Sequence, residues 1–273
     1  MFPESLIELT RFNEDTYAFR SGGYISVFIT TDQGVIVVDA IGGGNRRRTP
    51  DALKAAIAMV TDQPVRYLVY SRSAEDHGSG GIVFADTAEF VGHRNTASEL
   101  VARPDPRAPV PTITFDDALD LELGGKTVQL RWNALQPSDT CISVRYRNVL
   151  NAVDLLRPRS LPYADIPTGP PQGIVDCIAR LEADSDWDTV LFGHAIEGRI
   201  AGTREDAREY REYLQDLMAG VRAARAAGLA DNSEEMVEAI RRELAPRYGT
   251  WASFSTWLPS NIQGVIRWWS QEA

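Results

Sequence analysis

Continuous apolar segments and apolar residues at helical spacing predict strands and a helix in the first quarter of the chain. The segment "TYAFRSGGYISVFITTDQGVIVVDA" reads as successive strands that turn at 22–23 and at 32–34. Residues 35–38 are apolar without interruption, which is typical of a strand buried on both faces. Further on, Thr49 is a plausible N-cap with Pro50 as the first helical residue, and apolar residues recur at helical spacing through "TPDALKAAIAMVTDQ".

The middle of the chain continues this order of strands and helices. Residues 65–70 and 88–93 form short strand candidates, and the second is followed by a helix start, "RNTASELVA". The segment "ALDLELGGKTVQLRWN" alternates on both sides of Gly124 and Gly125, which indicates a hairpin. Another pair of strands is expected in "CISVRYRNVLNAVD", with its turn at 147–148.

Helical patterns dominate the last hundred residues. A proline-rich loop over 155–171 precedes a helix over 174–182, a strand over 189–194 and a long helix from Thr203. The apolar stripe of that long helix consists of Tyr210, Tyr213, Leu214, Leu217, Met218 and Val221. A second helical stretch covers about 233–244, and the end is aromatic, "WASFSTWLPSNIQGVIRWW". The simplest packing of all these elements is one α/β sandwich with a C-terminal helical extension.

Composition and charge exclude several classes of partner. The 273 residues carry a net charge of -10, which argues against a broad nucleic-acid surface and against adhesion to an anionic membrane. No run approaches 18 apolar residues, so no membrane span is expected, and the N-terminal segment lacks the features of a signal peptide. Cys141 and Cys177 lie in separate apolar segments and are expected to be reduced, buried thiols. A cytoplasmic enzyme fits these features.

Acidic and imidazole side chains follow four apolar strand candidates. Asp39 ends "VIVVD", Asp76 and His77 follow "YLVY", Asp154 ends "VLNAVD", and His194 ends "TVLFGH". If these strands are neighbours, the side chains meet at one edge of a sheet, where carboxylates and imidazoles suit a divalent metal such as zinc. Each residue alone has a plainer interpretation, because an aspartate after a strand is often a helix cap or a turn residue.

The third histidine of the chain, His93 in "VGHRNT", has a different expected role. It stands directly before the helix start at "RNTASELVA", so it is expected to cap or line that helix rather than to bind metal.

Five segments together resemble the metallo-β-lactamase-fold hydrolase superfamily over about residues 15–225. They are "GVIVVDA", "YLVYSRSAEDHGSGG", "NALQPSDTCISV", "VLNAVDLL" and "TVLFGHAIEG", in the order of that family's motifs. The resemblance implies an αββα sandwich of two mixed β-sheets flanked by helices. It implies one such domain over 1–225 and a C-terminal helical extension over 226–273 packed on it.

Departures from the family pattern affect only one of its two metal sites. Arg72 and Ala74 occupy the first two histidine positions of the loop motif. The third falls at Gln136 or, with a slip of one residue, at Leu135. The set that the family uses for its second site is complete in this chain: Asp76, His77, Asp154 and His194. The resemblance therefore implies one metal, zinc or another divalent ion, with Asp39 and Gln136 in supporting positions.

A single metal would supply hydroxide for attack on an electrophilic carbon, as in a lactone, amide, thioester or activated carbon–halogen bond. Asp76 would take part in catalysis. Arg72 would hold an anionic or polar substrate group, or else form a salt bridge with Glu75 or another acid. Tyr163 is a third catalytic-site candidate. It and the tryptophans Trp251 and Trp257 could line a pocket for an apolar small molecule, although both tryptophans are more simply core or interface residues.

Other activities remain open at the level of sequence. The segments "VLNAVDLL" and "WLPSNIQGV" resemble, more weakly, the branch that contains a hydrolytic aryl dehalogenase. A non-hydrolytic biosynthetic cyclase or lyase, or an inactive ligand-binding or interaction protein, could use the same fold. The helices after Thr203 could form a homodimer.

Overall fold

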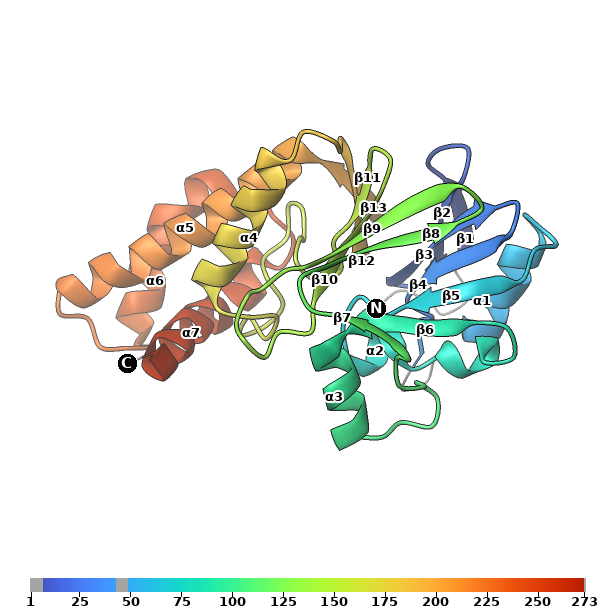
Figure 1. The fold of residues 1–273 in the computed structure, drawn as a ribbon. Helices are drawn as coiled ribbons and strands as arrows, with labels where there is room; N and C mark the ends of the chain where they lie inside the picture. The colour runs from blue at the N-terminus through green and yellow to red at the C-terminus, as the bar shows by residue number, and fades with distance from the viewer. Residues whose placement is uncertain (1–6, 43–48, 273) are drawn as a thin grey trace. The chain divides into compact units, whose positions relative to one another are not determined.

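A computed structural model describes residues 7–42 and 49–272 (Figure 1). Residues 1–6 of the N-terminal segment therefore lie outside the described part. The chain forms two compact units. The first comprises Met1–Asn133, Ser138–Val153 and Asp186–Ala201, and the second comprises Ala134–Pro137, Asp154–Ser185 and Gly202–Ala273. A division of the chain near residue 225 stays a prediction.

The first seven strands of the first unit lie side by side in chain order. They are β1 (Ile7–Arg11), β2 (Thr16–Ser21), β3 (Tyr24–Thr31), β4 (Gly34–Val38), β5 (Val65–Val69), β6 (Glu89–His93) and β7 (Ile113–Phe115). The neighbours from β1 to β4 are antiparallel, and those from β4 to β7 are parallel. Every residue of β4 is buried, as its unbroken apolar run predicted.

Six further strands continue the first unit, although the last two residues of the sixth belong to the second unit. They are β8 (Ala118–Leu123), β9 (Lys126–Trp132), β10 (Ile142–Tyr146), β11 (Val149–Asn151), β12 (Thr189–Ile196) and β13 (Arg199–Thr203). Gly124 and Gly125 both have positive φ, 56° and 70°, which the predicted tight hairpin between β8 and β9 requires. Strand β12 is parallel to β11 and antiparallel to β3, where Tyr24 pairs with His194. This pairing joins the two sets of strands.

Helices and a buried cluster complete the first unit. Its helical elements are α1 (Thr49–Ala58), α2 (Glu75–Gly78), the 3-10 helix η1 (Gly81–Phe84) and α3 (Arg94–Ala102). Helix α1 includes Thr49, whereas the sequence predicted Thr49 as the N-cap and Pro50 as the first helical residue. Between α1 and the strands lie buried side chains that include Phe19, Phe28, Val35, Leu53, Ile57 and Leu68. Burial of each larger one contributes roughly 1.5–3 kcal/mol.

Four helices form most of the second unit (Figure 1). They are α4 (Pro171–Ala183), α5 (Arg204–Ala226), α6 (Glu234–Tyr248) and α7 (Phe254–Glu272). Thr203 and Asp206 cap α5 reciprocally, and all six residues of its predicted apolar stripe are buried. Helix α5 contacts the other three helices. The aromatic end of the chain therefore belongs to a helix, α7, that packs on α5.

The predicted fold class is confirmed, since mixed strands with flanking helices are followed by C-terminal helices. Cys141 and Cys177 are both buried, as expected. Within residues 7–42 and 49–272, no helix has the length and apolar character needed to cross a membrane.

Candidate metal centre

Two predicted metal ligands lie in α2 and a third lies in β12. Asp76 and His77 occupy the four-residue helix α2, where a loop was expected, while β12 continues two residues beyond His194. Because β12 pairs with β3 and β5 lies two strands from β3, the element after β5 comes close to His194. Among the described residues, Asp76, His77 and His194 are the group whose ligand atoms all lie within 4.8 Å of one another.

The three ligand atoms form a nearly equilateral triangle. The two Nε2 atoms of His77 and His194 are 3.3 Å apart, and each lies 3.7 Å from Oδ2 of Asp76. The point in the plane of these three atoms that is equidistant from them lies about 2.1 Å from each, within the roughly 2.0–2.2 Å at which zinc binds nitrogen and oxygen ligands. Two imidazole nitrogens facing each other beside a carboxylate are a donor set that suits a cation.

Burial differs among the three side chains. His77 is fully buried, whereas the side chains of His194 and Asp76 are 20% and 32% exposed. A metal held by this triangle would thus have protein on the His77 side and solvent access on the other. Catalytic zinc sites have this feature, since they keep one coordination position for water or substrate.

Asp39 lies behind His77, away from the triangle. It directly follows β4, has a positive φ of 60° and is completely buried. Its Oδ1 accepts a hydrogen bond from the backbone N–H of Ser71 at 2.8 Å, and its Oδ2 accepts one from the Ser71 hydroxyl at 2.6 Å. The same Oδ2 is 3.5 Å from Nδ1 of His77. A carboxylate fixed in this way favours the orientation of His77 that turns Nε2 toward the other two ligands.

Replacing Asp39 by asparagine is expected to weaken zinc binding about 10–100-fold, because it removes the negative charge behind His77 but keeps the shape. Titration against a chromophoric chelator measures the change. Asp15→Asn is a matched control, since Asp15 is another carboxylate of the same unit and binds Lys126 and Tyr146 instead. Unchanged zinc affinity in Asp39→Asn would leave Asp39 a purely structural role.

Two residues beside the centre escaped the sequence analysis. A Cβ on Gly193 would lie 2.8 Å from Cε1 of His77 and 2.5 Å from Cγ1 of Val153, so this position has no room for a side chain. The half-buried ring of Tyr24 contacts the His194 ring edge-on, with centroids 4.7 Å apart, and the His77 ring at 6.2 Å. A glycine before a histidine is only a weak sequence signal for a metal site. Tyr24 could not be identified from the sequence, because only the pairing of β3 with β12 places it beside His194.

Asp154 begins the second unit, directly after Val153 of the first. It has a positive φ of 57°. Its part as a fourth ligand stays a prediction.

No histidine occupies the positions matched to the three missing metal ligands of the family. Arg72 is half-buried and follows Ser71, the partner of Asp39. Leu135 is buried, with Gly169 and Gly173 so close that a Cβ on either would touch it. Gln136 is half-buried. Burial of Leu135 in the second unit gives it a packing role.

The aromatic residues that were candidates for lining a pocket differ in exposure. Tyr163 is 57% exposed, and its ring meets that of half-buried Trp257 edge-on at 5.2 Å. Trp251 is buried against Tyr213 and Tyr248, so the core interpretation of this tryptophan is confirmed.

His93 has the capping role that the sequence indicated. Its Nδ1 accepts a hydrogen bond from the backbone N–H of Asn95 at the start of α3. Its ring stacks on Trp132 with centroids 4.8 Å apart, and burial lowers its pKa. A neutral imidazole is the form that can accept this bond.

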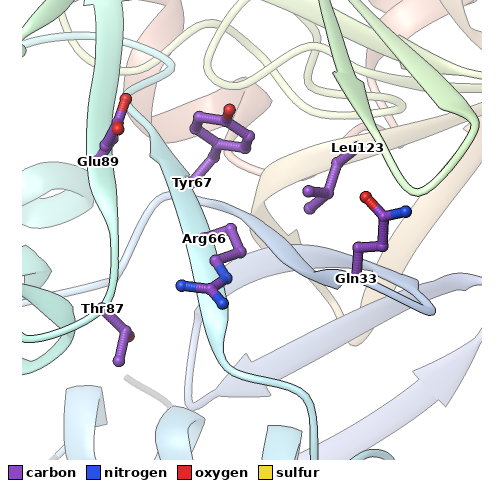
Figure 2. Close-up of a pocket in the computed structure, with 6 residues that line it drawn as sticks. All are labelled: Gln33, Arg66, Tyr67, Thr87, Glu89 and Leu123. Carbon is purple, nitrogen blue, oxygen red and sulfur yellow. The ribbon is translucent and has the colours of Figure 1, made fainter.

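A separate hollow of about 410 Å³ lies elsewhere in the first unit (Figure 2). It is lined by Gln33, Arg66, Tyr67, Thr87, Glu89 and Leu123. None of these residues was a site candidate, and none belongs to the triangle of candidate ligand atoms.

Comparison with solved structures shows similar folds at low sequence identity. A double mutant of the sec-alkyl sulfatase PisA1 matches 97% of this chain with a TM-score of 0.74 and 14% identity. The stereoselective inverting sec-alkylsulfatase Pisa1 from Pseudomonas sp. matches 97% with a TM-score of 0.70 and 15% identity. This chain spans 50% of the length of each alkylsulfatase chain.

A third solved structure has a size closer to this chain. A metallo-β-lactamase from Pontibacter korlensis matches 77% of this chain and 99% of its own length, with a TM-score of 0.63 and 15% identity. No protein-family model and no curated protein sequence matches the chain. The similarity to these solved structures nevertheless shows that the chain has the metallo-β-lactamase fold.

Proposed function

We propose that this chain is a metal-dependent hydrolase with one zinc ion per chain. The supporting observation is the triangle of His77 Nε2, His194 Nε2 and Asp76 Oδ2, whose dimensions suit zinc. Asp154 is the proposed fourth ligand. The residues matched to the family's other site, Arg72, Ala74 and Gln136 or Leu135, include no imidazole. A mononuclear centre follows from that difference.

A bound zinc ion would supply a water of lowered pKa and polarise a substrate oxygen. The residues of the chain do the remaining work. Asp39 orients His77, and the partial exposure of His194 and Asp76 leaves room for substrate. Arg72 is proposed to hold an anionic or polar substrate group, because a guanidinium binds carboxylate-like groups in a planar fork. Tyr163 is proposed to offer an aromatic surface.

The proposed substrates are small molecules with an electrophilic centre. Lactones, amides, thioesters and activated carbon–halogen compounds form the starting panel. Sulfate esters join it, because two structural neighbours are named as alkylsulfatases. A cytoplasmic location and a homodimer through the helices after Thr203 stay predictions.

Elemental analysis of protein purified without chelator and supplied with zinc tests the proposal. We expect about one equivalent of zinc per chain, since three possible ligand atoms lie within 4.8 Å of one another. Two equivalents would contradict a mononuclear centre. No retained metal would favour the alternative of an inactive ligand-binding protein.

Isotope-labelled water distinguishes hydrolysis from cyclase or lyase activity. A hydrolase incorporates one labelled oxygen into its product at each turnover, and mass spectrometry detects it. A product that forms without the label would identify a non-hydrolytic biosynthetic enzyme on the same fold.

A further inference from the structure

The segment between α3 and β7 holds both ends of α2 through two charged residues. The side chains of Asp105 and Arg107 form two hydrogen bonds with each other, from Nε to Oδ1 at 2.9 Å and from Nη2 to Oδ2 at 2.8 Å. Nη2 of Arg107 also donates to Oε1 of Glu75 at 2.9 Å, at the first residue of α2. Oδ2 of Asp105 accepts a hydrogen bond from the Ser79 hydroxyl at 2.5 Å, at the residue after α2.

These contacts bracket the two ligands of the candidate centre in α2. Glu75 directly precedes Asp76, and Ser79 follows His77 by two residues. The helix has four residues, and the side chain of its N-cap residue, Ala74, makes no capping hydrogen bond. Because so short a helix is unstable on its own, its position must come from contacts with the rest of the unit.

The segment that carries Asp105 and Arg107 is itself anchored. The carbonyl oxygen of Arg107 accepts a hydrogen bond from the N–H of Ile82 at 3.0 Å. The hydroxyl of Tyr70, the residue directly after β5, donates to the carbonyl oxygen of Pro109 at 2.8 Å. The guanidinium and carboxylate therefore extend to α2 from a fixed backbone.

We propose that Asp105 and Arg107 form a clamp that positions Asp76 and His77 and thereby sets the affinity of the centre for its metal. The clamp has this role only if the chain binds metal as proposed above. The two residues touch neither metal nor substrate, so they are positioning residues that act through Glu75 and Ser79.

Charge makes the clamp persistent at neutral pH. The Arg107 guanidinium and the Ser79 hydroxyl lower the pKa of Asp105 to about 2 against the opposing effect of burial. The Asp105 carboxylate is thus ionised at every pH at which histidine side chains are neutral and can bind zinc. Its side chain is 19% exposed, and charge-assisted, bidentate hydrogen bonds of this kind are among the stronger ones in proteins.

Four variants test the clamp. Arg107→Ala removes it, and Arg107→Lys keeps the charge but cannot bind Asp105 with two nitrogens while also reaching Glu75. Ser79→Ala removes only the bond at the end of α2 and is the mildest change, so it remains informative if Arg107→Ala does not fold. Arg103→Ala is the control, because Arg103 is exposed and lies in the same segment.

The measurements are the zinc dissociation constant by chelator competition and the absorption spectrum with cobalt(II) as the probe. We expect zinc binding to weaken about 10–100-fold in Arg107→Ala and about 10-fold or less in Ser79→Ala. Arg107→Lys should lie between wild type and Arg107→Ala, and Arg103→Ala should match wild type. The cobalt spectrum should change with the affinity, because it reports the ligand geometry.

Two results overturn the clamp in different ways. Wild-type zinc affinity and cobalt spectra in folded Arg107→Ala and Ser79→Ala, with only a lower melting temperature, would make the contacts merely structural. Failure of the wild-type protein itself to bind zinc or cobalt would overturn the proposed function, and the clamp with it.

Discussion

Replacing His194 by alanine is expected to reduce the zinc content from about one equivalent to nearly none. The variant loses one corner of the ligand triangle and leaves His77 Nε2 and Asp76 Oδ2, which lie 3.7 Å apart, as the remaining pair of the cluster. A lost ligand should cost more than the roughly 100-fold that loss of an outer partner costs. Any hydrolytic activity should fall with the metal content. Elemental analysis and chelator competition measure both the stoichiometry and the affinity.

His93→Asn is the matched control for this experiment. It also removes one of the three histidines, but His93 caps α3 and stacks on Trp132. Asparagine is a favourable N-cap residue, so the helix end should survive. Wild-type zinc content in His93→Asn and loss of zinc in His194→Ala would support the ligand set. One full equivalent in His194→Ala would contradict it.

Replacing Gly80 by alanine is expected to lower the free energy of unfolding by about 3 kcal/mol. The new Cβ would lie 1.8 Å from the carbonyl oxygen of Ala40 and 2.7 Å from Cγ of Pro50, so the backbone would have to move. This is the place where the residues after β4 meet the residues after α2, since the N–H of Ala40 donates to the carbonyl oxygen of His77 at 3.2 Å. Movement there displaces His77, so zinc affinity should fall as well.

Gly220→Ala is the control for the effect of a methyl group on a buried glycine. Gly220 lies inside α5, and its nearest neighbour would be 3.4 Å from the new Cβ, which is ordinary contact. Alanine should leave stability unchanged or raise it by up to about 1 kcal/mol, because it favours the helix. Thermal and denaturant unfolding compare the two variants. If Gly80→Ala were as stable as the wild-type protein, the close approach of the residues after α2 to the residues after β4 would be contradicted.

Local patterns were sufficient for most of the secondary structure. The unbroken apolar run before Asp39 predicted a fully buried β4, and the pair Gly124 and Gly125 predicted the tight turn between β8 and β9. Both features can be predicted from neighbouring residues, because a strand buried on both faces is apolar throughout and glycine readily adopts a positive φ. The terminal aromatic segment has no comparable local pattern, so the bounds of α7 within the predicted C-terminal helical extension were found only in the structure.

The residue types of the candidate centre were also evident in the sequence. Asp76, His77 and His194 stood out as acids and imidazoles after apolar strands, and the resemblance grouped them into one set. The sequence could not show how the first two are held, because the contacts come from residues about thirty positions away. Asp105 and Arg107 have no motif of their own, and their pairing with Ser79 and Glu75 depends on the path of the segment after α3.

The sequence by itself thus determined the strands, the turns and the chemical nature of the candidate ligands, because these depend on local spacing and side-chain type. The tertiary structure decided their convergence. His194 and His77 are separated by 117 positions, and the pairing of β12 with β3 brings their Nε2 atoms to 3.3 Å. Gly193 and Gly80 became significant only then, since the space that a side chain lacks is set by segments distant in the sequence.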